Sequence, residues 1–258
     1  MKAVVLCAGY GTRLGDLTRD IPKPMLRLEG QPLLAFLLGH LQAQGFLDVA
    51  VNLHFHPEAI RDWFGDGSRW QMRLAYAYEP RLLGTAGALK NLEDFLRGEE
   101  AFLVQYGDVL TDQDFGKLLQ SHRERRALAT LLVHQRSRSN SLVQLDDIGR
   151  IVGFLERPDE AARLGAVSPW VNSGICVCSA EILDHIPRGA ASDLPRDVFM
   201  PLVGSGRLQG VPLTGFRCAI DSPRRLAEAR AAVAGPRCRI RPLSGGGVRH
   251  GPDPQEAR

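Results

Sequence analysis

A short apolar strand that ends in a glycine-rich turn is the feature that most constrains the fold of this chain. Residues 3–6 (AVVL) are too few for a buried helix and indicate a central strand. The turn CAGYG (residues 7–11) follows, and its glycines allow a tight bend and the close approach of a ligand. Backbone N–H groups in such a turn can point at phosphate oxygens. The segment therefore predicts a phosphate-binding turn at the end of a buried strand.

Two cations accompany the turn. Arg13 follows it directly, and Lys23 stands between two prolines. Both add positive charge beside the phosphate-binding groups, as a nucleoside triphosphate requires. Two better-known phosphate loops do not fit. The P-loop ends in Gly-Lys-Ser/Thr, whereas Gly11 is followed by Thr12 and Arg13. The dinucleotide fingerprint needs a third glycine where this chain has Leu14.

Length and charge limit the class of protein. The chain has 258 residues and a net charge of +3, which fits one large α/β domain and does not call for nucleic acid or an anionic membrane. The five cysteines show no metal-ligand spacing with histidine, so we expect buried, reduced thiols in a cytoplasmic protein. We expect no signal peptide and no membrane span, because no apolar run is long enough. A homo-oligomer stays one option.

Strand-like and helix-like segments alternate along the first half of the chain. The expected strands are 48–53, 73–79, 101–106 and 128–134, and the expected helices are 32–44, 57–64, 85–96 and 112–126. A strand, a helix and a strand at this spacing form a right-handed parallel βαβ unit. The alternation predicts an α/β fold, three-layered and Rossmann-like, with a mostly parallel mixed sheet.

The pattern changes in the second half. The expected elements are a hairpin at 141–156, a strand at 171–178, short helices at 181–186 and 196–203, a strand at 216–220 and a helix at 223–234. We therefore expect one domain over residues 1–235. It would comprise a nucleotide-binding half (about 1–135) and a hairpin-containing, acceptor-binding insertion (136–235). Proline, glycine and charge predict a flexible tail over residues 236–258.

Two aspartates stand at the ends of apolar strands. Asp108 follows the expected strand 101–106, and Asp221 follows the expected strand 216–220. Ligands of open α/β sheets bind at the carboxyl ends of strands. A hard Mg²⁺ takes one or two carboxylates together with phosphate oxygens. We expect Asp108 and Asp221 to hold Mg²⁺ jointly. The simpler alternatives are a capping aspartate in a turn and helix capping near Ser222.

The opening segment, residues 1–26, resembles the sugar-1-phosphate nucleotidyltransferases. The resemblance is carried by the apolar strand, A-G-Y-G-T-R-L, a threonine and P-K-P, and it extends to about residue 235. These enzymes join a nucleoside triphosphate to a sugar 1-phosphate and release pyrophosphate. The stretch L-G-T-A-G-A-L (residues 83–89) is most similar to the mannose-1-phosphate guanylyltransferase branch. The resemblance implies Mg²⁺ as cofactor, and a nucleoside triphosphate and a sugar 1-phosphate as partners.

The resemblance also implies roles for single residues. Arg13 and Lys23 would be the catalytic cations, on the leaving pyrophosphate and on the α-phosphate. The nucleotide would contact Leu6, Ala8, Gly9, Gly11, Thr12, Glu79, Gly84, Thr85 and Gly107. The sugar phosphate would contact Glu156, Arg157, Asn172 and Gly174. The family has Glu-Lys-Pro where this chain has E-R-P (residues 156–158), and this difference leaves the exact sugar open among hexose, heptose and cyclitol phosphates.

Glu79 leads to a prediction of base choice. It stands beside the expected base pocket, just before the L-G-T-A-G stretch. An ionised carboxylate only accepts hydrogen bonds, and guanine offers two adjacent donors on one edge, so we expect GTP to be preferred. The alternatives are UTP, ATP, dTTP or CTP, with Glu79 facing solvent or pairing with Arg81. A regulatory homologue that binds nucleotide sugar without turnover is a further alternative, and a nicotinamide-dependent dehydrogenase is disfavoured by Leu14.

Overall fold

The computed structural model describes residues 1–136, 139–160 and 168–243. Its contacts divide the chain into two compact units that interleave along the sequence. The loop unit holds the glycine-rich turn and comprises residues 2–82, 106–113 and 215 onwards. The hairpin unit comprises Met1 and residues 83–105 and 114–214. Each unit therefore draws on both halves of the sequence, and the predicted division into a nucleotide-binding and an acceptor-binding half near residue 135 stays a prediction.

The loop unit is built on a parallel three-stranded arrangement. Strand β4 (Asp48–Leu53) lies between β1 (Ala3–Leu6) and β5 (Arg73–Tyr78), and both pairings are parallel. Leu6 aligns with Asn52, and Leu53 aligns with Tyr78, so the three strands end at one edge. Val4, Val5 and the inner residues of β4 are buried, as the apolar strand patterns predict. The residues that follow each strand are therefore brought to the same edge.

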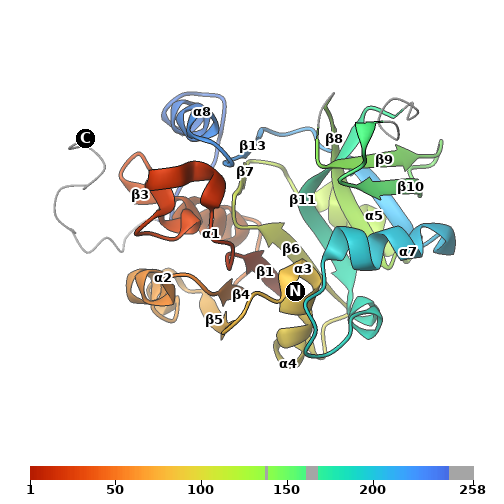
Figure 1. Cartoon of the computed structure of the whole chain (residues 1–258), viewed down its shortest axis with the longest axis horizontal. Coiled ribbons are helices and arrows are strands. Elements are labelled where there is room, and N and C mark those ends of the chain that lie inside the picture. The colour runs from red at the N-terminus through yellow and green to blue at the C-terminus, as the bar shows by residue number, and fades with distance from the viewer. Residues whose placement is uncertain (137–138, 161–167, 244–258) are drawn as a thin grey trace. The chain divides into compact units, whose positions relative to one another are not determined.

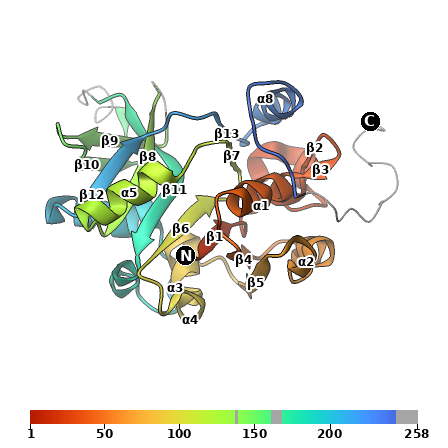
Figure 2. The same cartoon turned by 180° about the vertical axis from the view of Figure 1, so that it is seen from behind.

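Helices and two short ribbons complete the loop unit. Helix α1 (Leu33–Ala43) ends before the positive-φ Gly45, and α2 (Pro57–Phe64) begins at a proline that suits the first helical position. Helix α8 (Pro223–Ala234) is capped by the Ser222 side chain and lies beside β2 (Arg27–Leu28), which Figure 2 labels next to it. Figure 1 shows the same helix from the opposite side. The two-stranded ribbons are β2 with β3 (Gln31–Pro32), and β7 (Val109–Thr111) with β13 (Arg217–Ala219).

The hairpin unit is built around the long strand β11 (Trp170–Ser179). It runs antiparallel to β6 (Ala101–Tyr106, the last residue of which belongs to the loop unit) and to β8 (Ala129–Gln135). Strand β12 (Leu208–Pro212) extends β8 in parallel. The predicted hairpin is present as β9 (Ser141–Leu145) and β10 (Ile151–Glu156). Its α-helices are α3 (Gly84–Asn91), α4 (Glu93–Leu96), α5 (Gly116–Arg125) and α7 (Met200–Leu202). A π-helix lies at Leu194–Phe199, and 3-10 helices lie at Ala180–His185 and Val203–Ser205.

The predicted α/β class is confirmed, but two of the predicted helices differ from those in the structure. The helix expected over 85–96 is two helices, α3 and α4, that meet at Leu92. The helix expected from Asp112 begins at Gly116, and the strand β7 precedes it. Asp112 lies outside the helix because its carboxylate accepts hydrogen bonds from the backbone N–H groups of Phe216 and Arg239. Asp114 does sit at the helix start, where it accepts from the Gly116 N–H.

The expectation of a flexible tail from Pro236 does not hold for residues 236–243. Cys238, Ile240 and Leu243 are buried. The Leu243 N–H donates to the Ala35 carbonyl of α1 at 2.9 Å. Gly39 of α1 makes this possible, because a Cβ there would lie 2.4 Å from the Arg241 carbonyl oxygen. Residues 244–258 of the predicted tail lie outside the described residues.

Two other predictions concern cysteines and membranes. All five cysteines are free and buried, as expected of reduced core thiols. Within the described part of the chain, no helix combines the length and apolarity that crossing a bilayer would need.

Candidate functional site

The glycine-rich turn is held in place by its own backbone and by Thr18. Gly11 adopts a left-handed conformation (φ 70°), and a Cβ there would lie 3.2 Å from Thr18 and 3.3 Å from Lys23. The Gly11 carbonyl accepts from the Leu14 N–H at 2.9 Å and from the Thr18 hydroxyl at 3.0 Å. A Cβ at Gly9 would meet nothing within 4 Å, so the loop is open at that point. A ligand could approach the backbone closely there.

The four predicted charged residues form two ion pairs in the loop unit. Lys23 Nζ lies 2.6 Å from Asp108 Oδ2, and both side chains are largely buried, with 12% and 24% exposed. Arg13 lies 3.8 Å from Asp221 in a more open pair, with 65% and 30% exposed. Each predicted cation is thus placed beside a predicted metal ligand. Sequence patterns did not indicate this pairing, because the partners are far apart in the chain.

The β7–β13 ribbon brings the two aspartates together. Asp108 directly precedes β7 and Asp221 closely follows β13. The ladder continues by one hydrogen bond, from the Ile220 N–H to the Asp108 carbonyl at 2.8 Å. Among the described residues no group of three or more histidine, cysteine or acidic side chains could hold a metal. Two carboxylates fit a hard cation such as Mg²⁺ that takes its other ligands from phosphates and water.

Gly107 lets the Asp108 segment lie against the end of β1. A Cβ on Gly107 would lie 2.6 Å from Cys7 Sγ and 2.7 Å from the Leu6 carbonyl oxygen. The Gly107 N–H donates to that same carbonyl at 2.9 Å. Burial raises the pKa of the Cys7 thiol far above its usual range, and the charge of Asp108 raises it further. Cys7 is therefore an inert packing group at the base of the loop.

Glu79 follows β5, and its side chain is only 1% exposed. Its Oε1 accepts from Asn52 Nδ2 at 2.8 Å, and its backbone carbonyl lies 2.6 Å from His54 Nδ1. The alternative in which Glu79 faces solvent is therefore wrong. Asn52 and His54 were not among the predicted site residues. A usable signal was the polar residue at the end of the apolar strand D-V-A-V-N-L, which the parallel register brings to the same edge as Leu6.

The G-T-A-G stretch begins α3 in the hairpin unit, where a tight loop approaches it. A Cβ on Gly84 (φ 72°) would lie 2.4 Å from the Ser192 carbonyl oxygen, so only glycine fits. The Thr85 hydroxyl donates to Asp193 at 3.1 Å and accepts from the Leu194 N–H at 2.7 Å. The backbone N–H of Ala86 also donates to the Ser192 carbonyl. The helix start is thereby fixed from one side.

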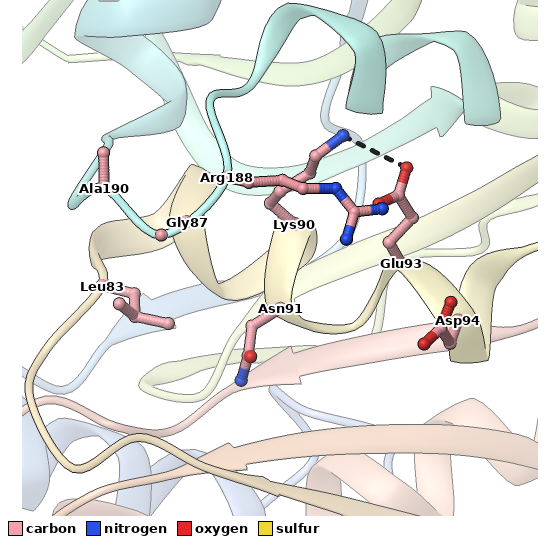
Figure 3. A pocket seen from close by; sticks show the side chains of 9 residues that line it. Leu83, Gly87, Lys90, Asn91, Glu93, Asp94, Arg188 and Ala190 are labelled. Carbon is pink, nitrogen blue, oxygen red and sulfur yellow. Dashed lines mark hydrogen bonds and ion pairs between the residues drawn. The ribbon is translucent and has the colours of Figure 1, made fainter.

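A pocket of about 270 Å³ lies against α3 within the hairpin unit. Figure 3 shows Lys90 and Arg188 directed at Glu93. Lys90 Nζ lies 3.1 Å from Glu93 Oε1 and 2.9 Å from the Leu183 carbonyl, and Arg188 pairs with the other carboxylate oxygen. These contacts lower the pKa of Glu93. Because both cations are engaged by Glu93, this pocket does not offer the open positive charge that a phosphate group needs.

The predicted sugar-phosphate residues lie on β10 and β11 of the hairpin unit. Glu156 ends β10, and its side chain is 16% exposed. Burial, reinforced by the charge of Asp193, raises the pKa of Glu156 to about 7. Arg157 has a positive φ of 49° and its side chain is 83% exposed, so its guanidinium is available to a ligand.

Asn172 and Gly174 form an irregularity in β11. The register with β8 shifts between Asn172 and Cys176, and Gly174 has a φ of 79°. The Asn172 side chain does not simply face solvent, because its Oδ1 accepts from the Gly174 N–H at 3.0 Å. The Ser141 hydroxyl accepts from the Asn172 N–H at 2.9 Å. The bulge thus orients Asn172 and leaves its Nδ2 group to donate elsewhere.

The structure therefore sorts the predicted residues into two groups. The loop unit contains Leu6, Ala8, Gly9, Gly11, Thr12, Arg13, Lys23, Glu79, Gly107, Asp108 and Asp221. The hairpin unit contains Gly84, Thr85, Glu156, Arg157, Asn172 and Gly174. The residues predicted for the triphosphate and the metal fall in the first group, and those predicted for the sugar phosphate fall in the second, together with Gly84 and Thr85 of the predicted base pocket.

One family model and several known proteins are similar to this chain. A family model described as "Nucleotidyl transferase" matches residues 2–210. The chain is 37% identical over 220 residues to a UTP–glucose-1-phosphate uridylyltransferase of Synechocystis, and 36% identical over 208 residues to a mannose-1-phosphate guanylyltransferase of Mycobacterium tuberculosis. Each match covers 80% of this chain but 56% of the relative. A Bacillus anthracis structure solved with sucrose superposes with a TM-score of 0.79 at 19% identity, over 90% of this chain and 94% of that one, which supports the fold.

Proposed function

The chain belongs to the nucleotidyl transferase family, and from this premise we propose that it transfers a nucleoside monophosphate from a nucleoside triphosphate to a sugar 1-phosphate. The observation that carries the proposal is the double ion pair beside the glycine-rich loop. Lys23 with Asp108 and Arg13 with Asp221 place two cations and two carboxylates next to backbone donors. The chain spans about half the length of the first relatives it matches, so the activity of the full-length protein is part of the proposal.

The reaction needs positioned charge more than proton transfer. A phosphate oxygen of the sugar 1-phosphate attacks the α-phosphorus, the bond to the bridging oxygen breaks, and pyrophosphate leaves. The nucleophile is already an anion, so catalysis rests on alignment and on stabilising the charge that develops. Lys23 would turn from Asp108 to the α-phosphate, and Arg13 would hold the leaving pyrophosphate. Asp108 and Asp221 would hold Mg²⁺, which supplies charge neutralisation to the phosphates.

The acceptor would be recognised by the hairpin unit. Glu156, with a pKa near 7, can both donate to and accept from a sugar hydroxyl in neutral solution. The exposed Arg157 guanidinium suits a phosphate, which it can hold through two parallel hydrogen bonds. Asn172 Nδ2 adds a donor for a hydroxyl. These groups fit a polyhydroxylated monophosphate such as mannose 1-phosphate or a related sugar or cyclitol phosphate.

We favour GTP as the triphosphate. Guanine presents two adjacent donors that an ionised carboxylate can accept, but Glu79 is 1% exposed and bonded to Asn52, so base reading by Glu79 would require this carboxylate to turn toward the ligand. The Mycobacterium tuberculosis relative is named for guanylyl transfer, which supports this choice. UTP is the second candidate, because the Synechocystis relative is named for UTP at nearly the same identity.

The test is a matrix of GTP, UTP, ATP, dTTP and CTP against a panel of sugar 1-phosphates, scored by pyrophosphate release with Mg²⁺ present. We expect turnover, with GTP and mannose 1-phosphate among the best pairs. Asp108→Asn and Asp221→Asn are the inactive controls, and circular dichroism establishes that they fold. Nucleotide binding with no turnover for any pair would instead support the regulatory alternative. Normal turnover by a folded Asp108→Asn would contradict the metal assignment.

A further inference from the structure

The glycine-rich loop is tied at its base to the ends of β4 and β5. The Cys7 N–H donates to Asn52 Oδ1 at 2.6 Å, and Asn52 Nδ2 donates to Glu79 Oε1 at 2.8 Å. All three residues are buried, with at most 5% of their surface exposed. A buried, hydrogen-bonded polar chain of this kind fixes the positions of its members, because leaving any one unpaired would be costly.

The same loop is tied a second time, at its tip. Tyr10 Oη lies 2.7 Å from His54 Nε2, and the two rings meet edge to face with centroids 5.0 Å apart. The other ring nitrogen, His54 Nδ1, lies 2.6 Å from the Glu79 carbonyl oxygen. Both ties therefore end on Glu79, one on its carboxylate and one on its backbone. The circuit runs Cys7, Asn52, Glu79, His54, Tyr10 and returns to the loop.

The circuit fixes the tautomer of the neutral imidazole. A carbonyl oxygen only accepts, so His54 Nδ1 must carry the hydrogen, and Nε2 is then the acceptor for the Tyr10 hydroxyl. The Tyr10 oxygen keeps lone pairs but has no hydrogen left to give. It can therefore accept from a ribose hydroxyl or a base amine, and it offers nothing to a phosphate oxygen.

We propose that Tyr10 and His54 are positioning residues that hold the glycine-rich loop in the shape that receives the triphosphate. This inference rests on the proposed function, because it takes the loop to be the phosphate site. Tyr10 stands between two glycines and is 48% exposed, so packing alone does not hold it. The hydrogen bond to His54 restricts the tip of the glycine-rich loop, so the nucleotide does not have to order this tip when it binds.

The test compares two tyrosines. Tyr10→Phe removes only the hydroxyl that reaches His54. Tyr78→Phe is the matched control, because Tyr78 is in the same unit, is also 48% exposed, and its hydroxyl has no hydrogen-bond partner among the described residues. The dissociation constant of each nucleoside triphosphate is measured without sugar phosphate, followed by steady-state kinetics and the thermal midpoint of unfolding.

We expect Tyr10→Phe to raise the nucleotide Kd and KM by roughly three- to tenfold, the scale of one hydrogen bond. The loop holds phosphates in the ground state and in the transition state alike, so kcat and the KM of the sugar phosphate should stay within about twofold. A purely structural role of Tyr10 would lower the thermal midpoint of unfolding without a selective rise in the nucleotide Kd and KM. His54→Gln should give a similar loss of nucleotide binding. The double variant should be no worse than the His54 variant, because both changes break the same hydrogen bond between Tyr10 and His54.

Each alternative result is distinguishable. If Tyr10→Phe binds nucleotide as Tyr78→Phe does, or if the Tyr10 and His54 effects add, the positioning role is wrong while the proposed function stands. If the wild type binds nucleotide without transfer, the proposed function fails and the Kd comparison still decides the role of Tyr10. If the wild type binds no nucleoside triphosphate, both fail together.

Discussion

Replacing Glu156 by glutamine should make the stability of the protein less sensitive to pH. The folded state holds the Glu156 proton more tightly than the unfolded chain, because burial and the charge of Asp193 raise the pKa of this carboxyl from 4.5 to about 7. The corresponding stabilisation is fully present below pH 4.5 and is lost as the pH rises through 7. Glutamine does not titrate, so the variant carries no such loss.

The size of the effect follows from the shift and from the exposure of the side chain. A shift of this width corresponds to at most about 3 kcal/mol between the two protonation states. The side chain keeps 16% of its surface in water, and solvent screening reduces the value, so we expect about 1–2 kcal/mol. The free energy of unfolding of Glu156→Gln should thus rise by this amount relative to the wild type between pH 4.5 and pH 8.

Urea denaturation of both proteins at pH 4.5 and pH 8 measures this difference, in which titrating groups that do not interact with Glu156 cancel. Glu124→Gln, a change at an exposed glutamate of α5, is the control and should show a smaller change. Asp193→Asn in both backgrounds should reduce the effect, because the Asp193 charge is its second cause. An unchanged difference between Glu156→Gln and wild type at the two pH values would show that Glu156 is not buried as described.

Three further changes test other parts of the structure. Lys23→Ala should lower kcat by roughly a hundredfold or more, with a smaller change in KM. The reason is that the Lys23 ammonium, which pairs with Asp108 in this structure, would stabilise charge that develops only in the transition state. An effect on KM alone would mean that Lys23 only binds substrate. Glu79→Gln separates two roles of this buried carboxylate. Base recognition predicts that the preference for GTP over the other triphosphates falls by roughly tenfold, more than total turnover does. An unchanged preference in competition assays would mean that Glu79 only ties the glycine-rich loop in place. Gly39→Ala should destabilise the protein by about 1–3 kcal/mol in thermal or urea unfolding, because its Cβ would collide with the Arg241 carbonyl; wild-type stability would mean that the segment after Pro236 is not docked on α1.

The features that the sequence predicted correctly are those with a local signature. The strand and glycine turn, the strand-end aspartates and the N-terminus of α8 each depend on a few neighbouring residues. The pairing of Lys23 with Asp108 depends on how β7 and the loop pack together, which no local pattern specifies. Asn52 and His54 were missed for the same reason, because only the parallel register of β1, β4 and β5 brings them next to the glycine-rich loop.

The docked segment after Pro236 shows a signal that composition obscured. Its proline and arginine content is typical of a disordered tail. Yet R-C-R-I-R (residues 237–241) alternates strictly between basic and apolar side chains, as a half-buried extended segment does. The structure buries Cys238 and Ile240, the apolar residues of this alternation. Periodicity was therefore the better guide here, because burial is decided residue by residue and composition averages over the segment.

The ribbon that joins β7 to β13 also determines when the aspartate pair can form during synthesis. Its two strands are residues 109–111 and 217–219, and residues 114–214 of the hairpin unit are translated between them. At ribosomal speeds this interval of roughly 100 residues takes about 5–20 s, so Asp108 emerges well before Asp221. Lys23 precedes both and can neutralise Asp108 in the nascent chain. The Lys23–Asp108 ion pair can therefore form first, and the Arg13–Asp221 pair closes only after the last strand has been made.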